Sequence, residues 1–209
     1  VTVRRPANDV RGGGVTNALT IDVEDWFQVS AFAPYIPRAG WDAAPRRVER
    51  NVERMLALLD DAGNRATFFT LGWIAERHPQ LVRRIAAAGH EVASHGYAHQ
   101  RATDLDRRAF REDVVRARAV LEDLAGTAVR GYRAPSFSIG PANDWAFDVL
   151  RETGHRYSSS IYPVRHDHYG VPDAPRFAHA AREGLMELPI TTARLWSRNW
   201  PAGGGGYFR

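Results

Sequence analysis

Short apolar segments typical of buried strands alternate along this chain with longer segments typical of amphipathic helices. The predicted strands cover residues 18–22, 66–71, 90–94, 128–133, 155–160 and 184–190. The predicted helices cover residues 46–62, 79–88, 105–124 and 144–153. This alternation limits the fold to a parallel sheet with helical crossovers.

A parallel sheet of this kind forms either a (β/α) barrel or a doubly wound sheet. No phosphate-binding glycine fingerprint follows the first predicted strand, which favours the barrel. A chain of 209 residues that is 44% hydrophobic can build one sizeable core, so we expect one domain over residues 17–209. Residues 1–16 contain "RGGG" among scattered polar residues and are expected to form a flexible lead.

The amino-acid composition excludes several kinds of catalytic and binding residue. The chain has no cysteine, and all 28 of its Lys and Arg residues are arginine. Thiolate nucleophiles, cysteine-ligated zinc, Schiff-base lysines and the P-loop lysine are therefore excluded. Any catalysis must use Asp, Glu, His, Ser, Tyr or a metal ion.

The net charge of +4 and the pI near 9.8 do not indicate a nucleic-acid site. The arginines are interleaved with acids, as in the stretch from Arg107 to Arg116, which is typical of a solvated helix face. No apolar run reaches the roughly 18 residues of a membrane span, and no signal-peptide pattern is present. These patterns predict no nucleic-acid partner and no transmembrane segment, and they favour a cytoplasmic protein.

The motif "SHGYAH" places His95 and His99 four residues apart, directly after the third predicted strand. On a helical turn, two histidines at this spacing point to the same side and suit one divalent ion. The alternative is that both are surface or packed histidines, because an isolated pair at this spacing is weak evidence for a metal.

An acidic cluster follows the first predicted strand in "TIDVED". Strand alternation places Asp22 and Glu24 on one side and Asp25 on the other, so one carboxylate can ligate a metal while its neighbour stays free as a base. A helix cap or a solvated turn is the alternative. With His95, His99 and Arg133, these residues lie at the carboxyl ends of predicted strands, where (β/α) barrels build active sites.

Three stretches carry a family resemblance: "ALTIDVEDWF", the run from Ala66 to Gln100 that contains "AAAGHEVASH", and "GYRAPSFS". In this order and spacing they resemble the NodB-homology polysaccharide deacetylases of carbohydrate esterase family 4, and most closely the subgroup associated with exosortase and exopolysaccharide clusters. The resemblance implies a distorted (β/α) barrel with an Asp-His-His metal site that deacetylates N-acetylated sugars.

The first motif departs from the family pattern T-F-D-D, in which the first Asp is a base and the second a metal ligand. Val23 occupies the second position here. Strand alternation makes Glu24 the preferred ligand, with Asp25 the alternative if the strand has already ended. The resemblance implies a divalent metal, with zinc expected and cobalt, manganese, magnesium or nickel as alternatives.

The resemblance also implies roles for the residues of the motif "RAPSF". Arg133 is expected to hold Asp22 ionised and oriented, and Pro135 to fix the loop so that the backbone N–H of Ser136 faces the developing oxyanion. Pro135 and the aromatic residues Trp26, Tyr97 and Phe137 are expected to contact the sugar. For any one aromatic residue, a place in the core is the alternative.

Two further departures concern residues outside these motifs. Ser158 stands in "YSSS" where the family tends to carry Asp. The histidine that protonates the leaving amine is expected beyond "GGGYFR", so the resemblance implies a domain incomplete at its C-terminus. His166 and His168 are the nearest substitutes for this acid.

The sequence therefore predicts a metal-dependent hydrolase that removes N-acetyl groups from a GlcNAc-type polysaccharide, either an exopolysaccharide or a peptidoglycan-like glycan. Two alternatives share the fold: an amidohydrolase acting on a small cyclic amide, as allantoinase does, and a non-catalytic sugar-binding domain. The oligomeric state is not predicted.

Overall fold

The computed structural model describes residues 17–166 and 169–203, so the predicted lead over residues 1–16 lies outside the described residues. Its strands are β1 (Thr20–Val23), β2 (Thr67–Thr70), β3 (Glu91–Ser94), β4 (Gly131–Tyr132), β5 (Tyr157–Ser158), β6 (His179–Arg182), β7 (Leu185–Glu187), β8 (Thr192–Leu195) and β9 (Arg198–Pro201). Its α-helices are α1 (Val48–Asp61), α2 (Gly72–Arg77), α3 (Pro79–Ala87), α4 (Arg107–Ala125) and α5 (Trp145–Glu152).

Seven strands form one curved sheet in the order β1-β2-β3-β4-β5-β7-β6, and β8 pairs with β9 in a separate hairpin. Neighbouring strands from β1 to β5, and β5 with β7, run parallel, whereas β6 is antiparallel to β7. Parallel strands that follow in sequence order, with no reversal, are typical of a (β/α) barrel rather than of a doubly wound sheet. The predicted mixed α/β, barrel-like fold is confirmed.

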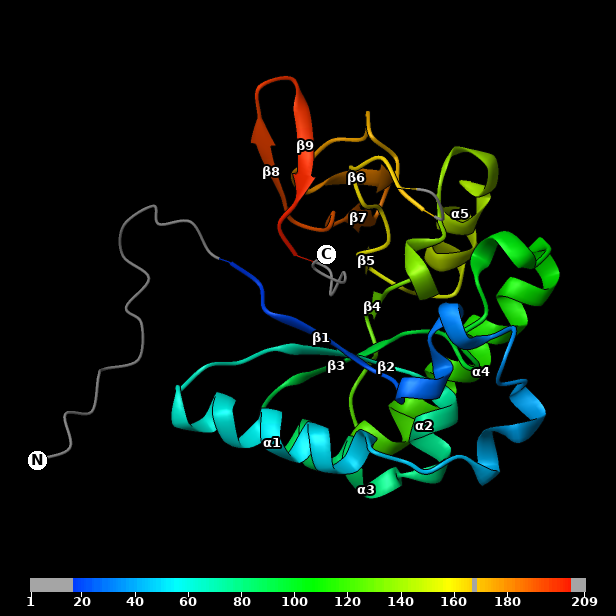
Figure 1. Cartoon of the computed structure of the whole chain (residues 1–209), viewed down its shortest axis with the longest axis vertical. Coiled ribbons are helices and arrows are strands. Elements are labelled where there is room, and N and C mark those ends of the chain that lie inside the picture. Colours follow the sequence, from blue (N-terminus) through cyan, green and yellow to red (C-terminus); the bar gives the residue numbers. More distant parts are fainter. Residues whose placement is uncertain (1–16, 167–168, 204–209) are drawn as a thin grey trace, which may run out of the picture.

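Helices cover the outer side of the first strands. Figure 1 shows α1 and α3 below β1 to β3, with the β8–β9 hairpin at the opposite end of the molecule. Helix α4 packs against α3 and β3. In α1 the residues Val48, Val52 and Leu59 are buried, as their helical spacing predicts, and they join a core that includes Phe68 of β2. The buried face of α4 packs with α5 in a second cluster around Tyr132.

The sequence missed three features. The short helix α2 directly follows β2, where no helix was predicted, and the antiparallel strand β6 and the β8–β9 hairpin were also not predicted. Strands β8 and β9 are mostly exposed, so they lack the apolar alternation on which strand prediction depends.

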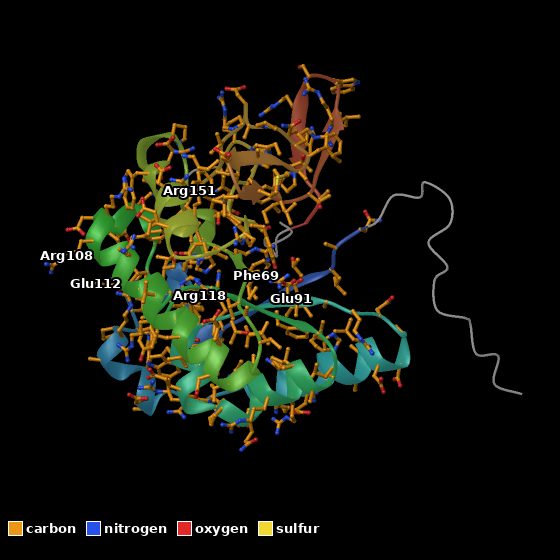
Figure 2. All side chains as sticks on the ribbon, turned by 180° about the vertical axis from the view of Figure 1, so that it is seen from behind. Phe69, Glu91, Arg108, Glu112, Arg118 and Arg151 are labelled. Atoms are coloured by element: carbon orange, nitrogen blue, oxygen red, sulfur yellow. The ribbon has the colours of Figure 1, made fainter. Side chains whose placement is uncertain are left out.

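Charged side chains cover the outer face of α4, as the interleaved sequence predicts. Arg108 and Glu112 project from the helix into solvent in Figure 2 and form an i,i+4 ion pair with N–O distance 3.3 Å. Among the described residues, no helix is both long enough and apolar enough to cross a membrane.

Candidate functional site

Three neighbouring strands end at the same edge of the sheet and deliver the polar residues. β1 ends at Val23, β3 at Ser94 and β4 at Tyr132, so Glu24, His95 and Arg133 each directly follow a strand. Because parallel strands have the same direction, their carboxyl ends meet, which is where active sites of such sheets form.

Glu24, His95 and His99 form a group with the geometry of a metal site. Their ligand atoms all lie within 4.8 Å of one another, and Glu24 Oε2 lies 2.9 Å from His99 Nε2. Within the described part of the chain, this buried oxygen has no hydrogen-bond partner. Ligand atoms around a tetrahedral zinc lie about 3.3 Å apart, so the three side chains fit one cation.

His95 is oriented by a backbone carbonyl. Its Nδ1 lies 2.8 Å from the carbonyl oxygen of Arg133, which can only accept, so Nδ1 donates and Nε2 is left free for a ligand. Burial lowers the pKa of His95, against the opposing effect of Asp22, and a low pKa favours the neutral ring that metals bind. His95 is therefore prepared as a ligand before any metal arrives.

The segment of residues 94–99, here called the histidine loop, is not the helical turn that the sequence predicted. Gly96 has φ 75° and His99 has φ 50°, so the loop turns back through left-handed conformations. A Cβ at position 96 would lie 2.9 Å from Asp113 Oδ2, which explains the glycine. The two histidines converge because the loop folds back, and not because of helical spacing.

Two charged side chains hold the histidine loop. Asp113, from α4, accepts a hydrogen bond from the Tyr97 amide at 3.0 Å. Arg38 donates from Nε to the carbonyl of Ala98 at 3.0 Å. Sequence reasoning missed both residues, because they lie on other elements of the fold. The acid at position 113 was interpreted only as part of a solvated face.

Asp25, the alternative ligand, is used elsewhere. Its Oδ1 accepts from the Trp26 amide at 2.9 Å, and its Oδ2 accepts from the amides of Arg47 and Val48 at 2.7 and 3.1 Å. Asp25 thereby caps a 3-10 turn and joins it to the start of α1. Although β1 ends before residue 24, Glu24 and not Asp25 faces the two histidines.

Arg133 binds Asp22 and is itself held on several sides. Its Nη1 lies 2.7 Å from Asp22 Oδ1, Nη2 donates to Thr20 Oγ1 at 3.0 Å, and Nε and Nη2 donate to Ser159 O and Oγ at 3.1 and 2.9 Å. The guanidinium also lies 4.1 Å from the ring centroid of Phe69, which Figure 2 shows on the sheet.

The Asp22 carboxyl is kept ionised by its neighbours. Burial acts to raise the pKa of Asp22, but His95 and Arg133 oppose it, and the resulting pKa lies below the ordinary value. A carboxylate that is ionised, oriented and close to the three candidate ligands has the properties of a general base.

Residues 133–138, here called the arginine loop, are strained after Pro135. Ser136 has φ 54° and ψ 30°, and Phe137 has φ 49°, a conformation that side chains other than glycine rarely adopt. The Ser136 hydroxyl lies 2.6 Å from that of Ser30. Phe137 is buried on Tyr162, with ring centroids 5.4 Å apart, which indicates a structural role for its ring.

The two other predicted sugar contacts differ from each other. The Tyr97 hydroxyl donates to Glu76 at 2.6 Å, and Arg116 lies over its ring. Its contact with substrate stays a prediction. Trp26 is half-buried, packs edge-on against Phe27 and donates to the Pro45 carbonyl at 3.0 Å. Its contact with substrate stays a prediction.

The residues and hydrogen bonds around Ser158 differ from the family pattern. The Ser158 hydroxyl donates to Ser160 Oγ at 2.8 Å, and the nearby carboxylate is that of Glu187, on β7, which sequence reasoning missed. The His166 ring stacks on Tyr169 with centroids 3.8 Å apart. Its use as the general acid stays a prediction, and His168 lies outside the described residues.

Comparison with known families and proteins adds an independent observation. A family model described as polysaccharide deacetylase matches residues 40–158, and one described as a domain of unknown function (DUF3473) matches residues 159–209. The first match covers more than half of the chain.

Named relatives agree with this match. A chitooligosaccharide deacetylase of Rhizobium leguminosarum bv. trifolii is 47% identical over 133 residues, which cover 62% of this chain and 54% of the relative. A chitooligosaccharide deacetylase of Sinorhizobium fredii is 36% identical over 98 residues, or 46% and 43% of the two chains. A crystal structure of a putative polysaccharide deacetylase from Mycobacterium smegmatis is 30% identical with TM-score 0.64, covering 83% of this chain and 58% of that one. The chain thus spans about half the length of these relatives.

Proposed function

We propose that this chain, which belongs to the polysaccharide deacetylase family, removes N-acetyl groups from a glycan of the N-acetylglucosamine type. One observation carries the proposal: the group Glu24, His95 and His99 and the ion pair Asp22–Arg133 lie together at one edge of the sheet. The names of the rhizobial relatives support an N-acetylated oligosaccharide as the substrate class. An exopolysaccharide is the substrate that the sequence resemblance favours.

Glu24, His95 and His99 would hold a divalent cation, with zinc expected because imidazole and carboxylate ligands suit it. Such a cation, when bound, polarises a carbonyl and makes a water acidic. The chain prepares the site through the His95–Arg133 contact, which leaves Nε2 free, and through the unsatisfied oxygen of Glu24. The two histidines are buried, whereas the Glu24 side chain is partly exposed and gives the group one solvent-facing side.

Asp22 is proposed to accept the proton of the attacking water. Arg133 occupies Asp22 Oδ1 from one side, so the carboxylate has a fixed direction and remains a base at neutral pH. The Ser136 amide is proposed to donate to the oxygen of the acetamide carbonyl as negative charge develops there. The left-handed backbone of Ser136 supports this role, because strain of this kind collects at functional sites.

The experiment is an acetate-release assay on N-acetylglucosamine oligomers, with allantoin as a cyclic amide for comparison and with a chelator as a second arm. We expect acetate from the oligomers, loss of activity after chelation, recovery with zinc and no ring opening of allantoin. His78→Ala is a matched control for His95→Ala, because His78 lies at the start of α3 and pairs with Glu49 outside the site. Glycan binding without acetate release would favour a sugar-binding domain, and activity on allantoin alone would favour an amidohydrolase.

A further inference from the structure

Glu187 is a fully buried carboxylate that lies outside the metal group and the Asp22–Arg133 pair. It is 0% exposed on β7. Its Oε1 accepts hydrogen bonds from the amides of Ser160 and Ile161, both at 2.8 Å, whereas Oε2 is buried without a partner in the part of the chain that is described. Burying an incompletely bonded carboxylate is costly, so its presence needs a reason.

The backbone that Glu187 holds is residues 158–161, here called the serine segment. This segment contacts the arginine loop at three points. Ser159 accepts from Arg133 through its carbonyl and its hydroxyl, and Ser160 Oγ accepts from the Ala134 amide at 2.9 Å. Any shift of the serine segment therefore moves the groups that orient the Arg133 side chain.

Backbone bonds hold only part of the serine segment. The Ser159 amide donates to Tyr132 O at 2.9 Å, and the Leu188 and Ile190 amides donate to Ser158 O and Ile161 O at 2.8 and 3.0 Å. β5 is two residues long, and its register with β7 pairs Tyr157 with Met186 and Ser158 with Glu187. The amides of Ser160 and Ile161 lie beyond that pairing, and the Glu187 carboxylate satisfies both. Two amide donors on one carboxyl oxygen form a short anchor, and an amide left buried without an acceptor is strongly disfavoured.

We propose that Glu187 is a positioning residue for the Asp22–Arg133 pair: it fixes the serine segment, which holds Arg133, which in turn orients Asp22. The importance of this path for catalysis rests on the proposed function, because there Asp22 accepts the proton from water. Glu187 needs no contact with substrate or metal for this role. Glu187 supplies a hydrogen-bond acceptor at a fixed place, so its side-chain oxygen matters more for this role than its negative charge.

Two substitutions separate the acceptor from the charge. Glu187→Gln keeps an oxygen that can accept both amides, whereas Glu187→Leu keeps a similar volume in the core and removes the acceptor. Leu185→Ala is the matched control, because Leu185 is buried on the same strand and its truncation weakens packing without removing a bond to the serine segment.

The test has two readouts on the full 209-residue chain. The first is the NMR signal of the Arg133 Nε–H, which reports its bond to Ser159 and needs no activity. The second is kcat and KM for acetate release, with zinc content measured in parallel. We expect Glu187→Leu to move the Arg133 signal and to lower kcat at least about tenfold, as small misplacements of catalytic groups do, while KM and zinc content stay near wild type.

Glu187→Gln and Leu185→Ala should keep the Arg133 signal and stay within about threefold of the wild-type kcat, far less than a misplaced catalytic group costs. A folded Glu187→Leu variant with unchanged signal and kcat would overturn the proposal. If Glu187→Leu does not fold, Glu187→Asp is used in its place. Its shorter side chain should also shift the Arg133 Nε–H signal, and an unchanged signal in this variant would overturn the proposal. A wild-type chain that releases acetate neither from the oligomers nor from an N-acetyl anilide, whose leaving group needs little protonation, refutes the proposed function. The NMR comparison still decides whether Glu187 positions Arg133.

Discussion

The histidine loop and the arginine loop stand side by side at the sheet edge, yet different parts of the molecule support them. The histidine loop is fixed by two side chains from outside the sheet, Asp113 on α4 and Arg38 in the 3-10 segment Arg38–Ala43 before α1. The arginine loop is fixed from within the sheet, where its Arg133 and Ala134 bind Ser159 and Ser160. The two loops share one backbone contact, from His95 Nδ1 to the Arg133 carbonyl, but their side-chain supports are separate. Side-chain substitutions should therefore separate zinc content from rate.

The largest expected effect falls on the histidine loop. His95→Ala or His99→Ala should leave the fold intact but remove stoichiometric zinc after dialysis. The loss of metal should cost several kcal/mol of transition-state stabilisation, roughly a thousandfold or more in rate. Metal analysis and acetate release on the same samples check this, with His78→Ala as the control. Unchanged zinc in both variants would mean that the histidines do not bind metal.

For Asp22, which the arginine loop orients, we expect the opposite result: zinc content is kept and the rate falls. Asp22→Asn should keep zinc bound and lower the rate by roughly 10²–10⁴-fold, the usual scale of a lost general base. The asparagine still accepts from Arg133, so the loop itself should stay in place. If Asp22→Asn also empties the metal site, Asp22 is a ligand and the two loops are not independent.

A smaller effect distinguishes the neighbouring acids Glu24 and Asp25. Glu24→Gln should weaken zinc binding by about a hundredfold, the upper range for altered metal surroundings. Asp25→Asn should instead lower the free energy of unfolding by about 1–2 kcal/mol, because it weakens a cap that accepts from three amides, and should leave zinc affinity unchanged. Zinc titration and denaturant unfolding of both variants measure the two effects. The reverse ranking in zinc affinity would make Asp25 the ligand.

Much of the arrangement at the sheet edge could be predicted from the sequence, because strand ends and apolar periodicity are local signals. The positions of β1, β3 and the four predicted helices follow from them, and so does the meeting of Glu24, His95 and Arg133 at one edge. The conformation of the histidine loop was not predictable in this way. It depends on Asp113, which is only 16 residues from Tyr97 but lies on another element, and helical spacing gave the wrong geometry.

The arginine loop shows the same limit for buried polar residues. Ser159 and Glu187 bind groups 26 or 27 residues away in the chain, and no local pattern marks a serine or glutamate as buried. "YSSS" was interpreted as a lost carboxylate at position 158, whereas the register of β5 and β7 places Glu187 directly opposite Ser158. Such residues become recognisable only when the strand pairing is known.

Asp113 should have a moderate effect that is confined to the histidine loop. Asp113→Ala removes the acceptor of the Tyr97 amide, so the loop should loosen and zinc affinity should fall by about tenfold, the lower range for groups that support metal ligands. Asp123→Ala, on the exposed side of the same helix, is the matched control. A large fall in rate for Asp113→Ala at saturating zinc would show instead that this acid also supports the base.

The smallest effect on activity is expected at His155, a buried residue whose ring centroid lies 5.8 Å from that of Tyr132 on β4. Burial, aided by Arg118, lowers the pKa of His155 to about 4. An unfolded chain, with a histidine pKa near 6.5, then binds the proton first, so the stability that His155 contributes is complete above about pH 6.5 and is lost as the pH falls toward 4. The loss amounts to roughly 3 kcal/mol, since one pKa unit corresponds to about 1.4 kcal/mol.

His155→Leu, which cannot take up a proton, should lose less stability than wild type between pH 6.5 and 4. The two stability curves should run parallel above pH 7, and kcat at neutral pH should change little. Denaturant unfolding at several pH values measures this difference, and equal acid sensitivity in both proteins would mean that His155 is not buried in its neutral form.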